Sequence, residues 1–122
     1  MSKDLIRLMQ ALFLPGAACS DAPREPAADV YRTRRGWLVK FELAGVRPED
    51  IELSAGGSAL TVRGVRRDWV PDAGCRHYRM EIAYNRFERT LELPCDVGQA
   101  DVSTDYRDGM LLVNIEQREA RP

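Results

Sequence analysis

Histidine and clustered cysteine are scarce in this 122-residue sequence, and their scarcity argues against metal sites and disulfide frameworks. His77 is the one histidine, while Cys19, Cys75 and Cys95 lie far apart without a CxxC pair. Such spacing supports neither a disulfide framework nor a zinc cluster, and it makes a reducing cytoplasm the expected compartment. A metal site at Cys75 and His77 would need two further ligands brought in by the fold.

Catalytic and phosphate-binding motifs are missing as well. The sequence contains no GxxxxGK[ST] loop, and a single histidine leaves little for a catalytic triad. A hydrolase or metal enzyme built on Cys75 and His77 is the only catalytic alternative that the residues suggest. We therefore expect no enzyme activity, no cofactor and no bound metal.

Neither charge nor hydropathy favours a nucleic acid or a membrane as partner. The 18 Lys and Arg residues balance 19 Asp and Glu residues, so the formal net charge of −1 produces no field that would attract a phosphate backbone. No apolar run approaches the roughly 20 residues that span a bilayer. Arg7 and Gln10 interrupt the first apolar segment, which argues against a secretory signal.

The first residues carry an apolar stripe at helical spacing. Between Ser2 and the stop signal Pro15-Gly16, the pattern predicts a short amphipathic helix. Its apolar residues are Leu5, Leu8, Met9, Leu12 and Phe13. A helix this short is marginal alone, so its stripe must dock on its own domain, on another copy or on other chains. With the Pro- and Ala-rich linker that follows, it forms an N-terminal arm over residues 1–27.

The remainder of the chain alternates apolar and polar residues in short runs, which is the period of half-buried strands. The runs are centred on Trp37-Val39-Phe41-Leu43, Leu60-Val62, Tyr78-Met80-Ile82, Phe87-Leu91-Leu93, Val102-Thr104-Tyr106 and Leu111-Val113-Ile115. Turn residues such as Asp108-Gly109 separate them. Close spacing without intervening helices predicts an all-β protein, an antiparallel immunoglobulin-like β-sandwich preceded by the short helix.

Four stretches in order resemble the small heat-shock proteins. They are residues 41–51 (Phe-Glu-Leu-Ala-Gly-Val-Arg-Pro-Glu-Asp-Ile), residues 60–64 (Leu-Thr-Val-Arg-Gly), residues 86–94 (Arg-Phe-Glu-Arg-Thr-Leu-Glu-Leu-Pro) and residues 106–115, which end in a hairpin with a Gly-hydrophobic-Leu step. The resemblance is to the microbial and plant branch and implies an α-crystallin domain over residues 28–116. The tail, residues 117–122, lacks the Ile/Val-x-Ile/Val motif that is usual in the family.

The resemblance implies an ATP-independent chaperone, a holdase that binds unfolding client proteins under stress and suppresses their aggregation. The alternative is a scaffold-type co-chaperone of the same sandwich fold, which would bind a folded partner. Such scaffolds lack the Arg-Phe-x-Arg segment that residues 86–89 contain. The implied partners are unfolding proteins, a second copy of this chain and a second small heat-shock protein.

Family resemblance also implies a client or partner groove between two edge strands. Its walls would be Ile51, Leu53 and Ala55 on one side and Ala100, Val102 and Thr104 on the other. Plain core or sheet packing is the alternative role for these six residues. Because the tail lacks the motif that fills this groove in large shells, we expect dimers or loose small oligomers with the groove open.

The resemblance further implies a dimer made by strand exchange. The loop from Arg66 to Arg86 would carry Tyr78, Met80 and Ile82 to the partner's Val30, Tyr31 and Arg32. Arg89 shares a strand face with Phe87, Leu91 and Leu93, and an unpaired guanidinium on such a face is unfavourable by several kcal/mol. We expect Arg89 to lie at or near the dimer interface and to pair with an acidic residue; a surface arginine that only extends into solvent is the alternative.

Overall fold

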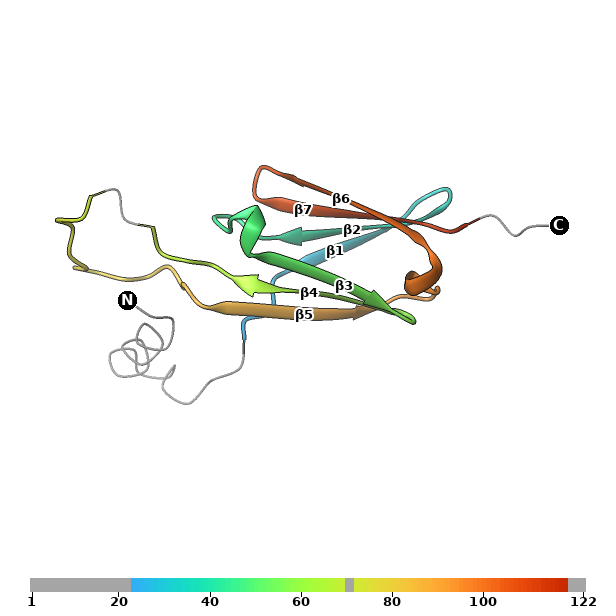
Figure 1. The fold of residues 1–122 in the computed structure, drawn as a ribbon, viewed down its shortest axis with the longest axis horizontal. Coiled ribbons are helices and arrows are strands. Elements are labelled where there is room, and N and C mark those ends of the chain that lie inside the picture. The colour runs from blue at the N-terminus through green and yellow to red at the C-terminus, as the bar shows by residue number, and fades with distance from the viewer. Residues whose placement is uncertain (1–22, 70–71, 119–122) are drawn as a thin grey trace.

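The structure is a computed structural model that describes residues 23–69 and 72–118. Two antiparallel sheets pack face to face (Figure 1). The four-stranded sheet has the order β1 (Ala28–Arg32), β2 (Gly36–Glu42), β7 (Met110–Glu116) and β6 (Asp101–Arg107). The three-stranded sheet has the order β3 (Ile51–Gly56), β4 (Ala59–Val65) and β5 (Arg86–Glu92). The expected all-β sandwich is confirmed.

Two single-turn 3₁₀ helices, η1 (Pro48–Asp50) and η2 (Val97–Gln99), connect the sheets. Each lies where the chain crosses from one layer to the other. Among the described residues, no helix is long and apolar enough to cross a membrane. The helix expected from Leu5 to Phe13 lies outside the described residues.

The core lies between the two sheets and follows the alternation of the sequence. On β2, Val39 and Phe41 have no exposed surface, and Leu60 and Val62 on β4 are buried to the same extent. Val113 and Ile115 on β7 complete the centre. Each fully buried aliphatic or aromatic side chain of this size contributes about 1.5–3 kcal/mol relative to an exposed one.

The β6–β7 hairpin turns at Asp108 and Gly109, both of which have positive φ angles, 54° and 77°. Two consecutive positive angles are typical of a type I′ turn, whose twist matches that of the flanking strands. The turn predicted from Asp108-Gly109 is therefore confirmed.

The segment expected to be a strand around Tyr78, Met80 and Ile82 is not one in the single chain. Residues 66–69 and 72–85 extend beyond the end of both sheets (Figure 1). A strand needs a neighbour for its backbone N–H and C=O groups, and none of the described strands lies alongside the segment. Alternation of side chains alone was therefore insufficient to form it.

Candidate functional site

The expected groove residues of β3 lie on the side of the sheet that faces the core. Leu53 is paired with Val62, and Ala55 with Leu60, in the β3–β4 register. Directly opposite residues in an antiparallel pair point to the same face. Since Leu60 and Val62 are buried, Ile51, Leu53 and Ala55 share their inward orientation.

The same holds for β6 in the other sheet. Val102 is paired with Ile115 and Thr104 with Val113, both of which are buried. Yet 38% of Val102 is exposed, and Thr104 is exposed too. These residues face inward, but the opposite sheet does not cover them.

β3 and β6 are the edge strands of their sheets and lie on the same side of the sandwich (Figure 1). Ile51 and Leu53 are half-buried against the core, while Ala55 is exposed. Ala100, in contrast, keeps only 9% of its surface exposed and belongs to the core cluster, because it directly follows η2 at the end of the sandwich. The packing alternative therefore describes Ala100, and the other five residues border an uncovered edge.

The residues expected at a dimer interface remain exposed in the single chain. Val30 and Tyr31 lie on β1, the outer strand of the four-stranded sheet. Tyr78 is fully exposed, and Met80 and Ile82 are exposed as well. The chain does not bring these two groups together, so their contact across two copies stays a prediction.

Arg32 and Arg89 both have partners inside the chain. The guanidinium of Arg32 lies 4.7 Å from the ring centroid of Trp37 on the neighbouring strand, within cation–π distance. Nη1 of Arg89 donates to the carbonyl oxygen of Pro26 at 2.9 Å, and the side chain is half-buried. Among residues 23–69 and 72–118, Arg89 thus pairs with a carbonyl and not with a carboxylate. An acidic partner from a second copy stays a prediction.

Tyr106, which sequence pattern did not mark as a site residue, ties the loop between β2 and η1 to the β6–β7 hairpin. Its hydroxyl lies 2.7 Å from the carbonyl oxygens of both Leu43 and Val46 and shares its proton between them. Burial raises the pKa of this phenol, while the positive charge of Arg66 partly opposes the shift. A tyrosine just before an Asp-Gly turn was the one signal available.

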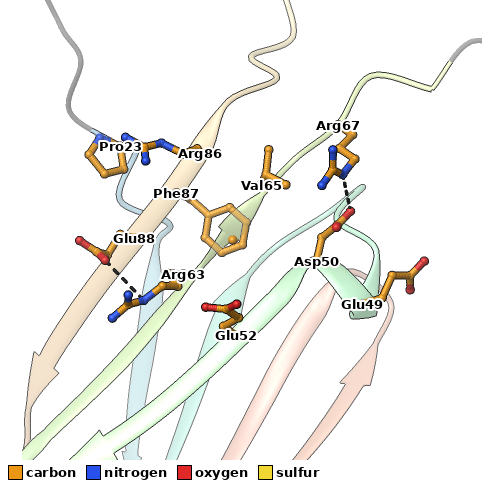
Figure 2. A pocket seen from close by; sticks show the side chains of 11 residues that line it. Pro23, Glu49, Asp50, Glu52, Arg63, Val65, Arg67, Arg86, Phe87 and Glu88 are labelled. Carbon is orange, nitrogen blue, oxygen red and sulfur yellow. Dashed lines mark hydrogen bonds and ion pairs between the residues drawn. The ribbon is translucent and has the colours of Figure 1, made fainter. Parts of the chain in front are cut away.

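A polar cavity of about 550 Å³ lies at the end of the three-stranded sheet (Figure 2). Arg67 pairs with Asp50 at 3.0 Å, and Arg63 with Glu88 at 3.6 Å. Pairs this exposed contribute about 0.2–1 kcal/mol each. Because both signs of charge are interspersed around it, the cavity has no uniform potential that would select an ionic ligand.

Comparison with known proteins agrees with this geometry. Residues 29–122 match the model of the Hsp20/alpha crystallin family. The chain is 31% identical to the 18 kDa heat shock protein of Streptomyces albus G over 116 residues, covering 93% of this chain and 78% of that protein. It is 23% identical to small heat shock protein C2 of Rickettsia felis over 77% of this chain, and spans 61% of that relative's length.

Among solved structures, hspA from Xanthomonas axonopodis superposes with a TM-score of 0.64 at 27% identity. The match covers 82% of this chain and the whole of that one. The two-sheet arrangement derived above is thus the arrangement found in that protein.

Proposed function

The chain belongs to the Hsp20/alpha crystallin family of small heat-shock proteins, and on that premise we propose that it is an ATP-independent holdase. In this role it binds unfolding proteins and keeps them from aggregating. Membership of the family implies a chaperone in general terms, and capture without nucleotide is the specific proposal.

The observation that carries the proposal is the inward-facing side of β6, which has apolar and methyl-bearing residues and no covering sheet. Val102 and Thr104 point toward the core side and remain exposed. An unfolding protein exposes apolar surface, and its burial against this edge yields about 25 cal/mol per Å² of apolar area. Two small side chains provide weak, unselective contact, which suits varied clients and reversible capture.

A dimer is the assembly that we propose for this activity. Val30 and Tyr31 lie on the open edge of β1, and Tyr78, Met80 and Ile82 are exposed on a segment without a neighbouring strand. Pairing between copies would satisfy the backbone of both elements. It would also cover an edge that otherwise invites aggregation.

The test is to heat citrate synthase above its unfolding temperature with and without the purified full chain and to follow light scatter in the absence of nucleotide. We expect suppression at about equal subunit concentrations, with no further effect of ATP. Unchanged scatter would contradict the holdase proposal and would favour the scaffold-type co-chaperone, which binds a folded partner.

A further inference from the structure

A short segment of the chain covers part of the outer edge of β5. Arg24 forms a parallel bridge with Phe87: its amide donates to the Arg86 carbonyl at 3.1 Å, and its carbonyl accepts from the Glu88 amide at 2.9 Å. We call residues 23–26 the edge cover. A third hydrogen bond also holds the edge cover: the carbonyl of Pro26 accepts from the side chain of Arg89.

The edge cover stops halfway along β5 for a chemical reason. Continuing the parallel ladder would require an N–H at position 26 to donate to the Glu88 carbonyl, and Pro26 has none. Since neighbouring residues of a strand direct their backbone groups to opposite sides, the amides of Thr90 and Glu92 point outward like that of Glu88. Within the described part of the chain, neither amide has a backbone partner.

Two cavities border the edge cover. Pro23 lines the 550 Å³ polar cavity, and Figure 2 shows it beside Arg86 at the outer side of β5. Residues 24–27 line a second cavity of about 280 Å³. Phe87 borders both cavities although little of its surface is exposed. Both volumes far exceed the roughly 30 Å³ that a water occupies in the liquid, so each cavity has room for a further side chain.

We propose that the edge cover is a displaceable strand and that an extended segment of an unfolding client takes its place on β5. Displacement leaves the Arg86 carbonyl and the Glu88 amide unpaired. Together with the unpaired amides of Thr90 and Glu92, they then form one row of backbone groups that can accept a new strand. The result is one continuous edge from Arg86 to Glu92, with Phe87 uncovered at its start. This inference rests on the proposed holdase function and adds a capture site on the opposite edge of the sheet from β3.

The geometry of the edge suits an extended chain of any sequence. Its present occupant is held through its backbone, and such pairing requires no particular side chains. Alternate side chains of an incoming strand would point to opposite faces. They would enter the two cavities that Pro23 and Arg24 now border without filling them. Weakly held covers of this kind also keep an edge from pairing with other chains when no client is present.

Three single substitutions in the full chain test the proposal. Arg24→Pro removes the amide that donates to Arg86 and loosens the cover. Pro26→Ala restores an N–H that can donate to the Glu88 carbonyl, so it should hold the edge cover more tightly. The carbonyl of residue 26, which accepts from Arg89, is kept. Glu25→Pro is the matched control, because the Glu25 amide takes part in none of the cover's hydrogen bonds. A proline also restricts the residue before it to an extended backbone, and Arg24 already has one in its bridge to Phe87.

Two readouts are combined. Amide exchange at Glu88, followed by NMR, reports opening of the cover, and fluorescence anisotropy with labelled, permanently unfolded carboxymethylated α-lactalbumin reports binding. One hydrogen bond contributes about 1 kcal/mol, so Arg24→Pro is expected to speed exchange and tighten binding by about fivefold. Pro26→Ala is expected to slow exchange and weaken binding by a similar factor, and Glu25→Pro to leave both unchanged.

Faster exchange at Glu88 with unchanged binding would overturn the proposal, as would equal effects of the two proline substitutions. Stronger self-association of Arg24→Pro in sedimentation, without tighter probe binding, would assign the edge to a second copy and also overturn it. If Arg24→Pro does not fold, the Pro26→Ala result decides. Failure of the wild-type chain to suppress citrate synthase aggregation would instead reject the holdase function, independently of whether the cover opens.

Discussion

Arg89 reaches back along the fold to Pro26, and its Nη1 lies 2.9 Å from a carbonyl oxygen 63 positions earlier in the sequence. Arg89→Ala removes this charge-assisted hydrogen bond and leaves the Pro26 carbonyl without its partner. We expect a loss of about 1.5–3 kcal/mol in the free energy of unfolding, seen as a melting temperature lower by several degrees.

Arg86→Ala on the same strand is the control, since the exposed Arg86 side chain forms no hydrogen bond or ion pair with the described residues. Its effect should stay within about 0.5 kcal/mol. Equal melting temperatures for Arg89→Ala and the wild type, together with equal dimer dissociation constants, would show that the bond to Pro26 has no energetic role.

Tyr106 should produce a loss of stability at alkaline pH. Its folded-state pKa is raised, chiefly by burial, so the folded state favours the protonated phenol. That contribution is complete below the ordinary tyrosine pKa of about 10 and is lost as pH rises through the folded-state pKa. Urea unfolding at a series of alkaline pH values should show the decline in the wild type.

Tyr106→Phe should be less stable near neutral pH by about 1–3 kcal/mol, because the Leu43 and Val46 carbonyls lose their donor. It should also lack the part of the alkaline decline that Tyr106 causes. Tyr78→Phe, at a fully exposed position, is the control and should follow the wild-type profile. Parallel profiles for all three proteins would refute the assignment.

The segment between β4 and β5 is expected to be needed for dimers and dispensable for the fold. Tyr78 and Ile82 are exposed in the single chain, and neither belongs to the core. Replacing residues 68–82 with a short Gly-Ser turn should give a folded monomer in sedimentation experiments. A variant that remains dimeric would rule out strand exchange through this segment.

Val102→Asp is expected to weaken client capture several-fold while the fold persists, because the side chain is exposed and a carboxylate there opposes burial of apolar surface. Ser103→Asp is the matched control one residue along β6. Ser103 is paired with Asn114 and lies on the outer face of the sheet. The measurement is the concentration of protein that halves the light scatter of heated citrate synthase; equal values for both variants would remove the inward face of β6 from the capture site.

Gly64 is required by close packing at the end of the three-stranded sheet. A Cβ atom at this position would collide with the Asp50 carbonyl oxygen and would lie 2.6 Å from Cζ of Phe87. Gly64→Ala should therefore destabilise the chain by about 1–3 kcal/mol. Gly74→Ala is the control, since a Cβ atom there would have only Oδ1 of Asp72 nearby, at 3.6 Å. Its melting temperature should be close to that of the wild type.

Much of the fold followed from local pattern. The alternation at Val39 and Phe41, and at Leu60 and Val62, predicted strands whose inward residues are now the centre of the core. The Asp108-Gly109 turn was predictable because positive φ angles are readily adopted by so few residue types. These features depend on neighbours within a few positions, which is the range over which a sequence pattern is informative.

The candidate site was predictable only in part. Family resemblance assigned Ile51, Leu53, Val102 and Thr104 to the walls of one groove, but it could not tell a covered face from an open one. Ala100 proved to be buried because η2 turns it into the core. Whether a face is covered depends on the extent of the opposite sheet, and no stretch of either strand encodes that extent.

By itself, the sequence determined the strand segments that became β2, β4, β5, β6 and β7, the hairpin turn and the resemblance to the small heat-shock proteins. Tertiary structure alone decided that Arg89 bonds Pro26, that Tyr106 holds Leu43 and Val46, and that Arg24 covers β5. It also left the alternating residues 78–82 without strand structure in the single chain. These four features share one reason, because each depends on whether a backbone group from a distant part of the chain is present as a partner. Backbone groups are alike in every residue but proline, so their pairing leaves little trace in the side-chain pattern.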